Sequence, residues 1–173
     1  MAVRQFLTLV NGAIQRVNAI ISSAGVGDAN KIVATGADGR LDATLMPVGI
    51  GTDSLTVQAS ENLAAGDFVN IHDVTGSARV RKASGADSTK PAVGFVLNGV
   101  TSGANATVFF EGTNTALTGL TIGTEYILSP TVPGGVVAAN TALTAGQSYQ
   151  RLGVATGTTA MTTEIDQPIA IVA

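Results

Sequence analysis

Two aspartates in the stretch KIVATGADGRLDATLMP, residues 31–47, are the first side chains of this sequence whose spacing suggests chemistry. Asp38 and Asp42 could both offer carboxylate oxygens to a hard cation such as Ca²⁺. A calcium loop, however, places oxygen ligands at alternate positions, and Arg40 stands where a ligand would be needed. We therefore predict no metal here. We expect Asp38 and Gly39 to form a hairpin turn in a joint that ends at Pro47.

Catalytic residues are as sparse as metal ligands. His72 is the single histidine, and the chain has no G-x-S-x-G elbow to supply a serine nucleophile beside it. The carboxylates are scattered singly, without the pairing typical of a glycosidase. The glycine-rich stretches lack the G-K-S/T of a phosphate loop. We predict no enzyme activity and no cofactor, and keep a surface-glycan hydrolase only as the weakest alternative.

Composition points to a class of protein rather than to a reaction. Only 12% of the residues are charged, cysteine is absent and the formal net charge is -3. These values exclude disulfides and thiolate metal sites and give no basic stripe for nucleic acid. The one local basic cluster, Arg79, Arg81 and Lys82 with nearby Lys90, is interpreted as a solvated face, with an acidic partner surface as the alternative.

The N-terminal segment shows a heptad-like apolar rhythm, which predicts an α-helix over residues 1–27 that associates with copies of itself. β-Branched residues at both core positions favour three strands over two, so a trimeric coiled coil is the simplest interpretation. The alternative is an amphipathic helix packed on its own domain. Interspersed polar residues argue against a membrane span or a signal peptide. The predicted association residues are Val3, Phe6, Leu7, Val10, Ala13, Ile14, Val17, Ile20, Ile21 and Ala24.

Residues 28–53 are predicted to form the hairpin-like joint, and residues 54–173 a β-domain. Short stretches rich in Val, Ile, Thr, Phe and Tyr, separated by turn residues, indicate a mainly β fold with an antiparallel barrel or sandwich. No helical period follows residue 30.

A weak internal repeat divides this β-domain into two related halves, about 54–113 and 114–173. LAAGDFVNI resembles LTIGTEYIL, so that Leu63 matches Leu120 and Gly66 matches Gly123. Further along, Gly94 matches Gly153, and ATVFFEG is paired with QPIAIVA at the end of the chain. We therefore expect a duplicated module.

Three stretches resemble tailed-phage structural proteins of the head-fibre and capsid-decoration type. NKIVATGADGRLDATLMP is similar to a joint of the form GKIV…DGKLD…LLP that leads out of an N-terminal helix in phage fibres. LAAGDFVNI…ARVRKAS…KPAVGFVLNGVTSGANATVFFEG and LTGLTIGTEYILSP…GGVV…AGQSYQRLGVATG look like a β-module of such proteins. The resemblance covers residues 30–173.

The resemblance implies a homotrimer on the virion, at the capsid surface, with the major capsid protein or another virion protein as its partner. It implies no catalytic residues, no nucleic acid and no membrane. The short length and the lack of a long fibrous repeat favour the head over the tail. A receptor-binding tail fibre or spike remains the second alternative.

Overall fold

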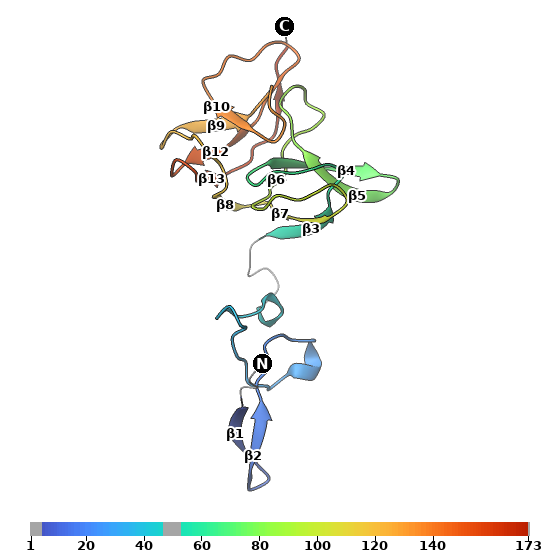
Figure 1. Ribbon diagram of the computed structural model, residues 1–173, viewed down its shortest axis with the longest axis vertical. Coiled ribbons are helices and arrows are strands. Elements are labelled where there is room, and N and C mark those ends of the chain that lie inside the picture. Colours follow the sequence, from blue (N-terminus) through green and yellow to red (C-terminus); the bar gives the residue numbers. More distant parts are fainter. Residues whose placement is uncertain (1–4, 47–52, 173) are drawn as a thin grey trace. The chain divides into compact units, whose positions relative to one another are not determined.

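A computed structural model describes residues 5–46 and 53–172 of the chain, which divides into two compact units, Met1–Gly51 and Thr52–Ala173. We call them the N-terminal and C-terminal units and describe each by itself (Figure 1). The fold is mainly β, as predicted, and the described residues contain no α-helix. Val3 and Pro47 lie outside the described residues.

The N-terminal unit begins with a β-hairpin, so the predicted association helix and its coiled coil are wrong. Strand β1 (Gln5–Val10) pairs antiparallel with β2 (Ala13–Asn18), from Val10 opposite Ala13 to Gln5 opposite Asn18. Asn11 and Gly12 form the two-residue turn with φ of 51° and 80°. Positive φ at both turn residues matches the right-handed twist of the strands, and Asn-Gly is the dipeptide that adopts it most readily.

The apolar spacing explains why the sequence suggested a helix. Phe6, Val10, Ala13 and Val17 follow one another at intervals of four, three and four, as in a coiled coil. A hairpin with a two-residue turn gives the same spacing. Residues four apart share one face of a strand, and the pairs Val10–Ala13 and Phe6–Val17 lie opposite each other across the two strands. The turn chemistry of Asn11 and Gly12 therefore decides between two structures that the apolar pattern fits equally.

The remainder of the N-terminal unit is held by short local contacts. A single parallel bridge joins Ile20 to Val33, and 3-10 turns occupy Val26–Asp28 (η1) and Ala43–Leu45 (η2). Ala34 is the only buried residue among residues 5–46. Residues 5–46 therefore form no hydrophobic core of their own.

The C-terminal unit contains two five-stranded antiparallel sheets and a two-stranded sheet. The first sheet has the strand order β3-β7-β6-β4-β5, the second has β10-β9-β12-β13-β8, and β11 pairs with β14. Neither five-stranded sheet is a closed barrel, which corrects the predicted barrel. The strands are β3 (Ser54–Gln58), β4 (Phe68–Val74), β5 (Ser77–Lys82), β6 (Gly94–Phe95), β7 (Asn105–Phe109), β8 (Gly112–Asn114), β9 (Glu125–Leu128), β10 (Val136–Ala138), β11 (Ser148–Tyr149), β12 (Arg151–Ala155), β13 (Met161–Thr163) and β14 (Ile169–Ala170).

The two five-stranded sheets have the same topology. In chain order, β3, β4, β5, β6 and β7 of the first sheet correspond to β8, β9, β10, β12 and β13 of the second, whose strand order is then read from β8 to β10. The register agrees as well, because Gly94 lies opposite Val69 in the first sheet and Gly153 lies opposite Tyr126 in the second. One detail of the sequence comparison is wrong. β13, and not QPIAIVA, takes the place of β7, since Ile169 and Ala170 pair with β11 instead.

Equivalent hydrogen bonds fix equivalent turns in the two sheets. The amide of Gly66 donates to the carbonyl of Val96 at 2.8 Å, and the amide of Gly123 donates to that of Ala155 at 2.9 Å. Both glycines have positive φ, 88° and 79°, a conformation that other residues adopt only with strain. The matched glycines of the sequence therefore occupy matched turns.

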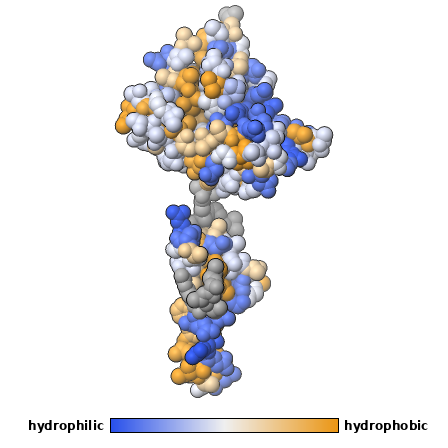
Figure 2. Space-filling model, in the orientation of Figure 1, coloured by the Kyte–Doolittle hydropathy of each residue, from blue (hydrophilic) through white to orange (hydrophobic). Residues whose placement is uncertain are grey.

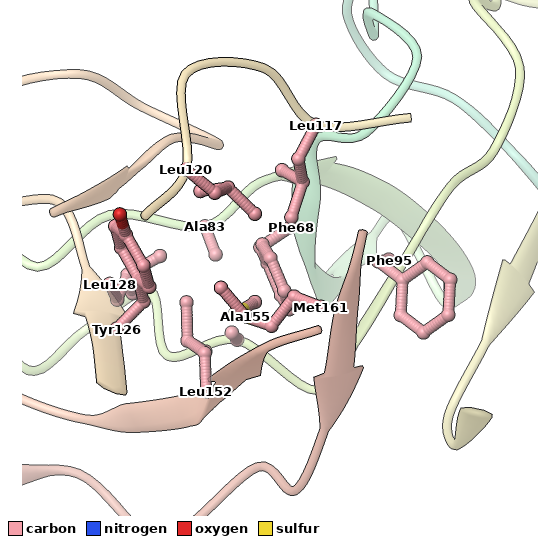
Figure 3. Close-up of a cluster of buried hydrophobic side chains, with 11 residues drawn as sticks. Phe68, Ala83, Phe95, Leu117, Leu120, Tyr126, Leu128, Leu152, Ala155 and Met161 are labelled. Carbon is pink, nitrogen blue, oxygen red and sulfur yellow. The ribbon is translucent and has the colours of Figure 1, made fainter. Parts of the chain in front are cut away.

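Aromatic side chains of the first sheet reach into the core of the second. Phe68 and Phe95, 0% and 1% exposed, belong to the cluster that contains Leu120, Leu152 and Met161. Their ring centroids lie 6.1 Å apart, and Figure 3 shows Phe68 pointing into this cluster. Burial of two such side chains stabilises the unit by about 3–6 kcal/mol. A second cluster lies within the first half of the unit: Val57, Ala59, Leu63, Val69, Val80, Val96, Ala106 and Val108.

The second sheet has polar residues where the first uses aromatic ones. By the matched register, Glu125 and Thr162 occupy the positions of Phe68 and Phe109. Thr162 is exposed and Glu125 half-buried, whereas Phe68 is fully buried. Val154, which takes the place of Phe95, is apolar, so two of these three matched positions are polar in the second sheet.

The substitution Gly12→Ala distinguishes a hairpin from a helix, because it should destabilise the hairpin and would stabilise a helix. A helix would gain about 1 kcal/mol from Gly12→Ala. In the hairpin, alanine must adopt a left-handed conformation at a cost of roughly 1–2 kcal/mol. We expect Gly12→Ala to reduce the amide hydrogen-exchange protection of residues 5–18 by a factor of about 5–30. Increased protection would contradict the hairpin.

Close packing between strands predicts a large effect of Gly94→Ala. A Cβ at Gly94 would lie 2.5 Å from the carbonyl oxygen of Phe109, whereas at Gly157 the nearest atom is 3.5 Å away. Gly94→Ala should lower the free energy of unfolding of the C-terminal unit by about 1–3 kcal/mol. Gly157→Ala, the matched control, should change it by less than about 1 kcal/mol. Equal stability of the two variants in urea unfolding would refute the packing argument.

Candidate association surface

A cavity of about 720 Å³ opens between the two halves of the C-terminal unit. Glu111, Glu164 and Asp166 line it, together with the buried side chain of Gln150. The Gln150 side-chain amide is hydrogen-bonded through both its oxygen and its nitrogen. Its oxygen accepts from the amide of Ala92, and its nitrogen donates to the carbonyls of Ala92 and Asp166. Neither a histidine nor a basic side chain lines the opening. The hydroxyl groups of Thr113, Thr162 and Thr163 complete its polar lining.

His72 lies elsewhere, on β4 opposite Arg79 of β5. Its pKa is lowered, first by burial and then by the charge of Arg81. No hydrogen bond within the described part of the chain joins its side chain to a carboxylate or a serine hydroxyl. The surroundings favour a neutral imidazole in a structural position, and the geometry is not that of a catalytic triad.

Arg151 holds together three segments of the second sheet. Its Nε donates to Glu125 at 2.9 Å and its Nη1 to Glu164 at 2.8 Å, while the Tyr149 hydroxyl donates to Glu125 at 3.2 Å. The Arg151 hydrogen bond is the main cause of the lowered pKa of Glu125. These contacts join β9, β12 and the segment after β13, so their role is structural.

Two side chains of the basic cluster predicted at residues 79–90 bind other residues of the C-terminal unit. Arg81 donates to the side chain of Asn70 at 3.0 Å, and Lys82 forms an ion pair with Asp67 at 3.2 Å. Arg79 and Arg81 do share a strand face, as the sequence indicated.

The two aspartates of the joint serve their own backbone. Asp42 accepts hydrogen bonds from the amide and hydroxyl of Thr44 at the start of η2, and these bonds lower its pKa. Asp38 accepts from the Arg40 amide, in a turn where Gly39 has φ of 78°. The turn is present, but its flanking segments are not paired as strands. Across the described residues, no group of three or more histidine, cysteine or acidic side chains is placed to hold a metal ion.

The feature that stands apart is exposed apolar surface on the N-terminal unit. Among the described residues, eleven large hydrophobic side chains are exposed in this unit and seven in the much larger C-terminal unit. Figure 2 shows apolar residues at the surface of the hairpin end. The eleven are Phe6, Leu7, Leu9, Val10, Ile14, Ile21, Val26, Ile32, Val33, Leu41 and Met46.

The hairpin divides the predicted association residues between its two faces. Phe6, Val10, Ala13 and Val17 lie on one, which we call the Phe6 face. Leu7 and Ile14 lie on the opposite one, the Leu7 face, together with Leu9. Sequence reasoning missed Leu9 because it falls outside the heptad stripe. Simple alternation about the Asn-Gly turn would have found it. Ile20, Ile21 and Ala24 follow the hairpin in the chain.

Exposure of both faces has a direct energetic consequence. An isolated two-stranded hairpin is marginally stable in water. Leu7, Leu9 and Ile14 are 71%, 69% and 73% exposed, and each would gain roughly 1.5–3 kcal/mol from full burial. The described residues of the N-terminal unit contain no core that could provide that burial.

Comparisons with known proteins give a likeness among solved structures only. No protein-family model and no curated protein matches the chain. Among solved structures, the chain is similar to the N base of head fiber gp8.5 in bacteriophage phi29, with a TM-score of 0.45 and 14% identity over 68% of this chain and 96% of that chain. These values are too low to show a common fold, so the proposals below rest on the residues of this chain. In the described ranges, no helix is long and apolar enough to cross a bilayer.

The Arg151 contacts predict a stability that depends on pH. The folded-state pKa of Glu125 lies below its ordinary value of 4.5, so its contribution is complete above that pH and is lost as the pH falls through the lowered pKa. Glu125→Gln should lower the melting temperature at pH 7. Between pH 7 and pH 3, the melting temperature of this variant should fall less than that of the wild type. Glu111→Gln is the control, since Glu111 has no hydrogen bond or ion pair in the described ranges. Identical melting curves for both variants at pH 7 and pH 3 would contradict this role.

Proposed function

We propose that this chain is a structural protein of a tailed-phage virion, a capsid decoration or head-fibre protein. It assembles as a homotrimer through the N-terminal unit and attaches to the capsid surface, with the C-terminal unit as the outward β-domain. The observation that carries the proposal is the pairing of a coreless unit, apolar on both hairpin faces, with a unit that buries its own core.

The C-terminal unit supports a role in assembly rather than in chemistry. Its buried polar side chains are used internally, as Gln150 is by Ala92 and Asn114 by the carbonyl of Gly66. No histidine, lysine or arginine is among the residues that line the large cavity beside its carboxylates. Such a unit suits a virion surface, where a stable, charge-poor β-domain adds bulk and contact area.

The number of copies and the place on the virion come from sequence resemblance. The heptad argument for three strands no longer applies, because the helix is a hairpin. The stretches that resemble head-fibre and decoration proteins imply three chains on the particle, and the short length without a long fibrous repeat favours the head over the tail. Three weak contacts from one trimer would also reinforce each other through effective concentration, without requiring a large interface per chain.

The proposal predicts a measurable oligomer and measurable binding to heads. Light scattering should give three times the 17.3 kDa chain mass, and the protein should bind purified heads that lack it. The double variant Ile14→Asp and Val17→Asp, which charges both hairpin faces, should abolish both properties. The matched control, Ile122→Asp and Val132→Asp, charges two exposed apolar residues of the C-terminal unit and should preserve both.

A wild-type chain that remains monomeric at high concentration and does not bind heads would overturn the proposal. Labelled protein found only at the tail tip would replace the head-fibre role with that of a receptor-binding tail fibre or spike.

A further inference from the structure

The two faces of the hairpin differ in charge as well as in residue content. The Phe6 face carries the cross-strand pairs Phe6–Val17, Thr8–Gln15 and Val10–Ala13, and none of these residues is charged. The Leu7 face carries Leu7–Arg16 and Leu9–Ile14, with Gln5 and Asn18 joined by a side-chain hydrogen bond of 3.1 Å. Arg16 therefore lies in the middle of the Leu7 face.

A three-fold axis places each residue of the central face next to its own copies. Three copies of Arg16 on such an axis would bring like charges together away from water, and the desolvation of each would cost several kcal/mol. Residues 5–18 contain no aspartate or glutamate that could neutralise them. Charge therefore disfavours the Leu7 face at the axis of a homotrimer.

The Phe6 face suits the axis for three reasons. It has no charge to desolvate, Ala13 allows close approach near the turn, and Phe6 supplies a large apolar surface near the other end. Between them, Thr8 and Gln15 form one polar layer. The Gln15 amide both donates and accepts, so copies of this layer can satisfy each other when buried. A single polar layer in an apolar interface also fixes the register of the chains, as it does in coiled coils.

We infer that the Phe6 face packs against the same face of two further copies around the three-fold axis, which leaves the Leu7 face for the contact with the capsid. This inference rests on the proposed homotrimer and adds which surface joins the copies and which remains free. The occupant of the Phe6 face is thus the chain itself. Arg16 and the three exposed aliphatic side chains of the Leu7 face remain for a different protein surface.

The natural absence of cysteine permits a clean cross-linking test in the full chain. Gln15→Cys places a thiol on the Phe6 face, and Arg16→Cys places one on the Leu7 face of the adjacent residue. Thiols that meet at the axis can approach within the 4.4–6.8 Å Cα separation of a disulfide. Under mild oxidation, Gln15→Cys should give a covalent dimer containing up to two of every three chains, and Arg16→Cys should remain uncross-linked.

Two aspartate variants test which hairpin face holds the trimer together and which binds heads. Val17→Asp, on the Phe6 face, should reduce the mass to that of one chain. Ile14→Asp, on the Leu7 face, should keep the trimer mass and weaken binding to heads by at least tenfold. Both substitutions lie on β2, so a general loss of the hairpin would affect them alike.

The outcomes separate this inference from the proposed function. Cross-linking of Arg16→Cys but not Gln15→Cys, or dissociation by Ile14→Asp but not Val17→Asp, would overturn the assignment of faces while a trimeric wild type upholds the function. Trimers that survive both aspartates without cross-linking through either cysteine would show that the hairpin is not the interface. A monomeric wild type would instead contradict the proposed function.

Discussion

Apolar surface that the N-terminal unit cannot bury by itself is the constraint on which the rest of this account depends. Five of its eleven exposed large hydrophobic side chains lie on a two-stranded hairpin, a structure with two faces and no interior. Ala34 alone is buried within residues 5–46. The described residues of so small a unit, without a core, do not bury enough apolar surface to offset the conformational entropy lost on ordering their backbone. The proposed association would supply the missing burial at these same residues.

The C-terminal unit buries its apolar side chains internally, because two modules of the same topology pack against each other. Phe68 and Phe95 carry the apolar face of the first module into the core of the second, so neither half is complete alone. Glu125 and Thr162 at the matched positions give the second module a polar outer face. In this respect the unit resembles repeat proteins, whose terminal repeats also need a polar outer surface.

Much of the β-domain could be predicted from the sequence, because its signals are local. Runs of β-branched and aromatic residues mark most strands, and Gly66 and Gly123 mark turns that require positive φ. The pairing of QPIAIVA with β7 failed, since a two-residue strand such as β14 carries too little pattern to show which neighbour it joins. Closure into a barrel could not be judged either, because it depends on contacts far apart in the chain.

At the candidate site the predicted secondary structure is wrong, whereas the association residues stay a prediction. Phe6, Val10, Ala13 and Val17 were identified as associating residues, but on a helix. Apolar spacing alone could not distinguish that helix from a hairpin, and the division into two faces follows only from the turn at Asn11 and Gly12. That division separates Arg16 from the uncharged face, and the proposal of different partners for the two faces rests on it.

Amide hydrogen exchange of residues 5–18, measured over a range of chain concentrations that spans dissociation, tests the central claim most directly. If association orders the N-terminal unit, protection of the β1 and β2 amides will rise with concentration and vanish on dilution, while protection in β4, β9 and β12 stays constant. Hairpin protection that is high and independent of concentration would contradict the account, because the unit would then be stable without any partner.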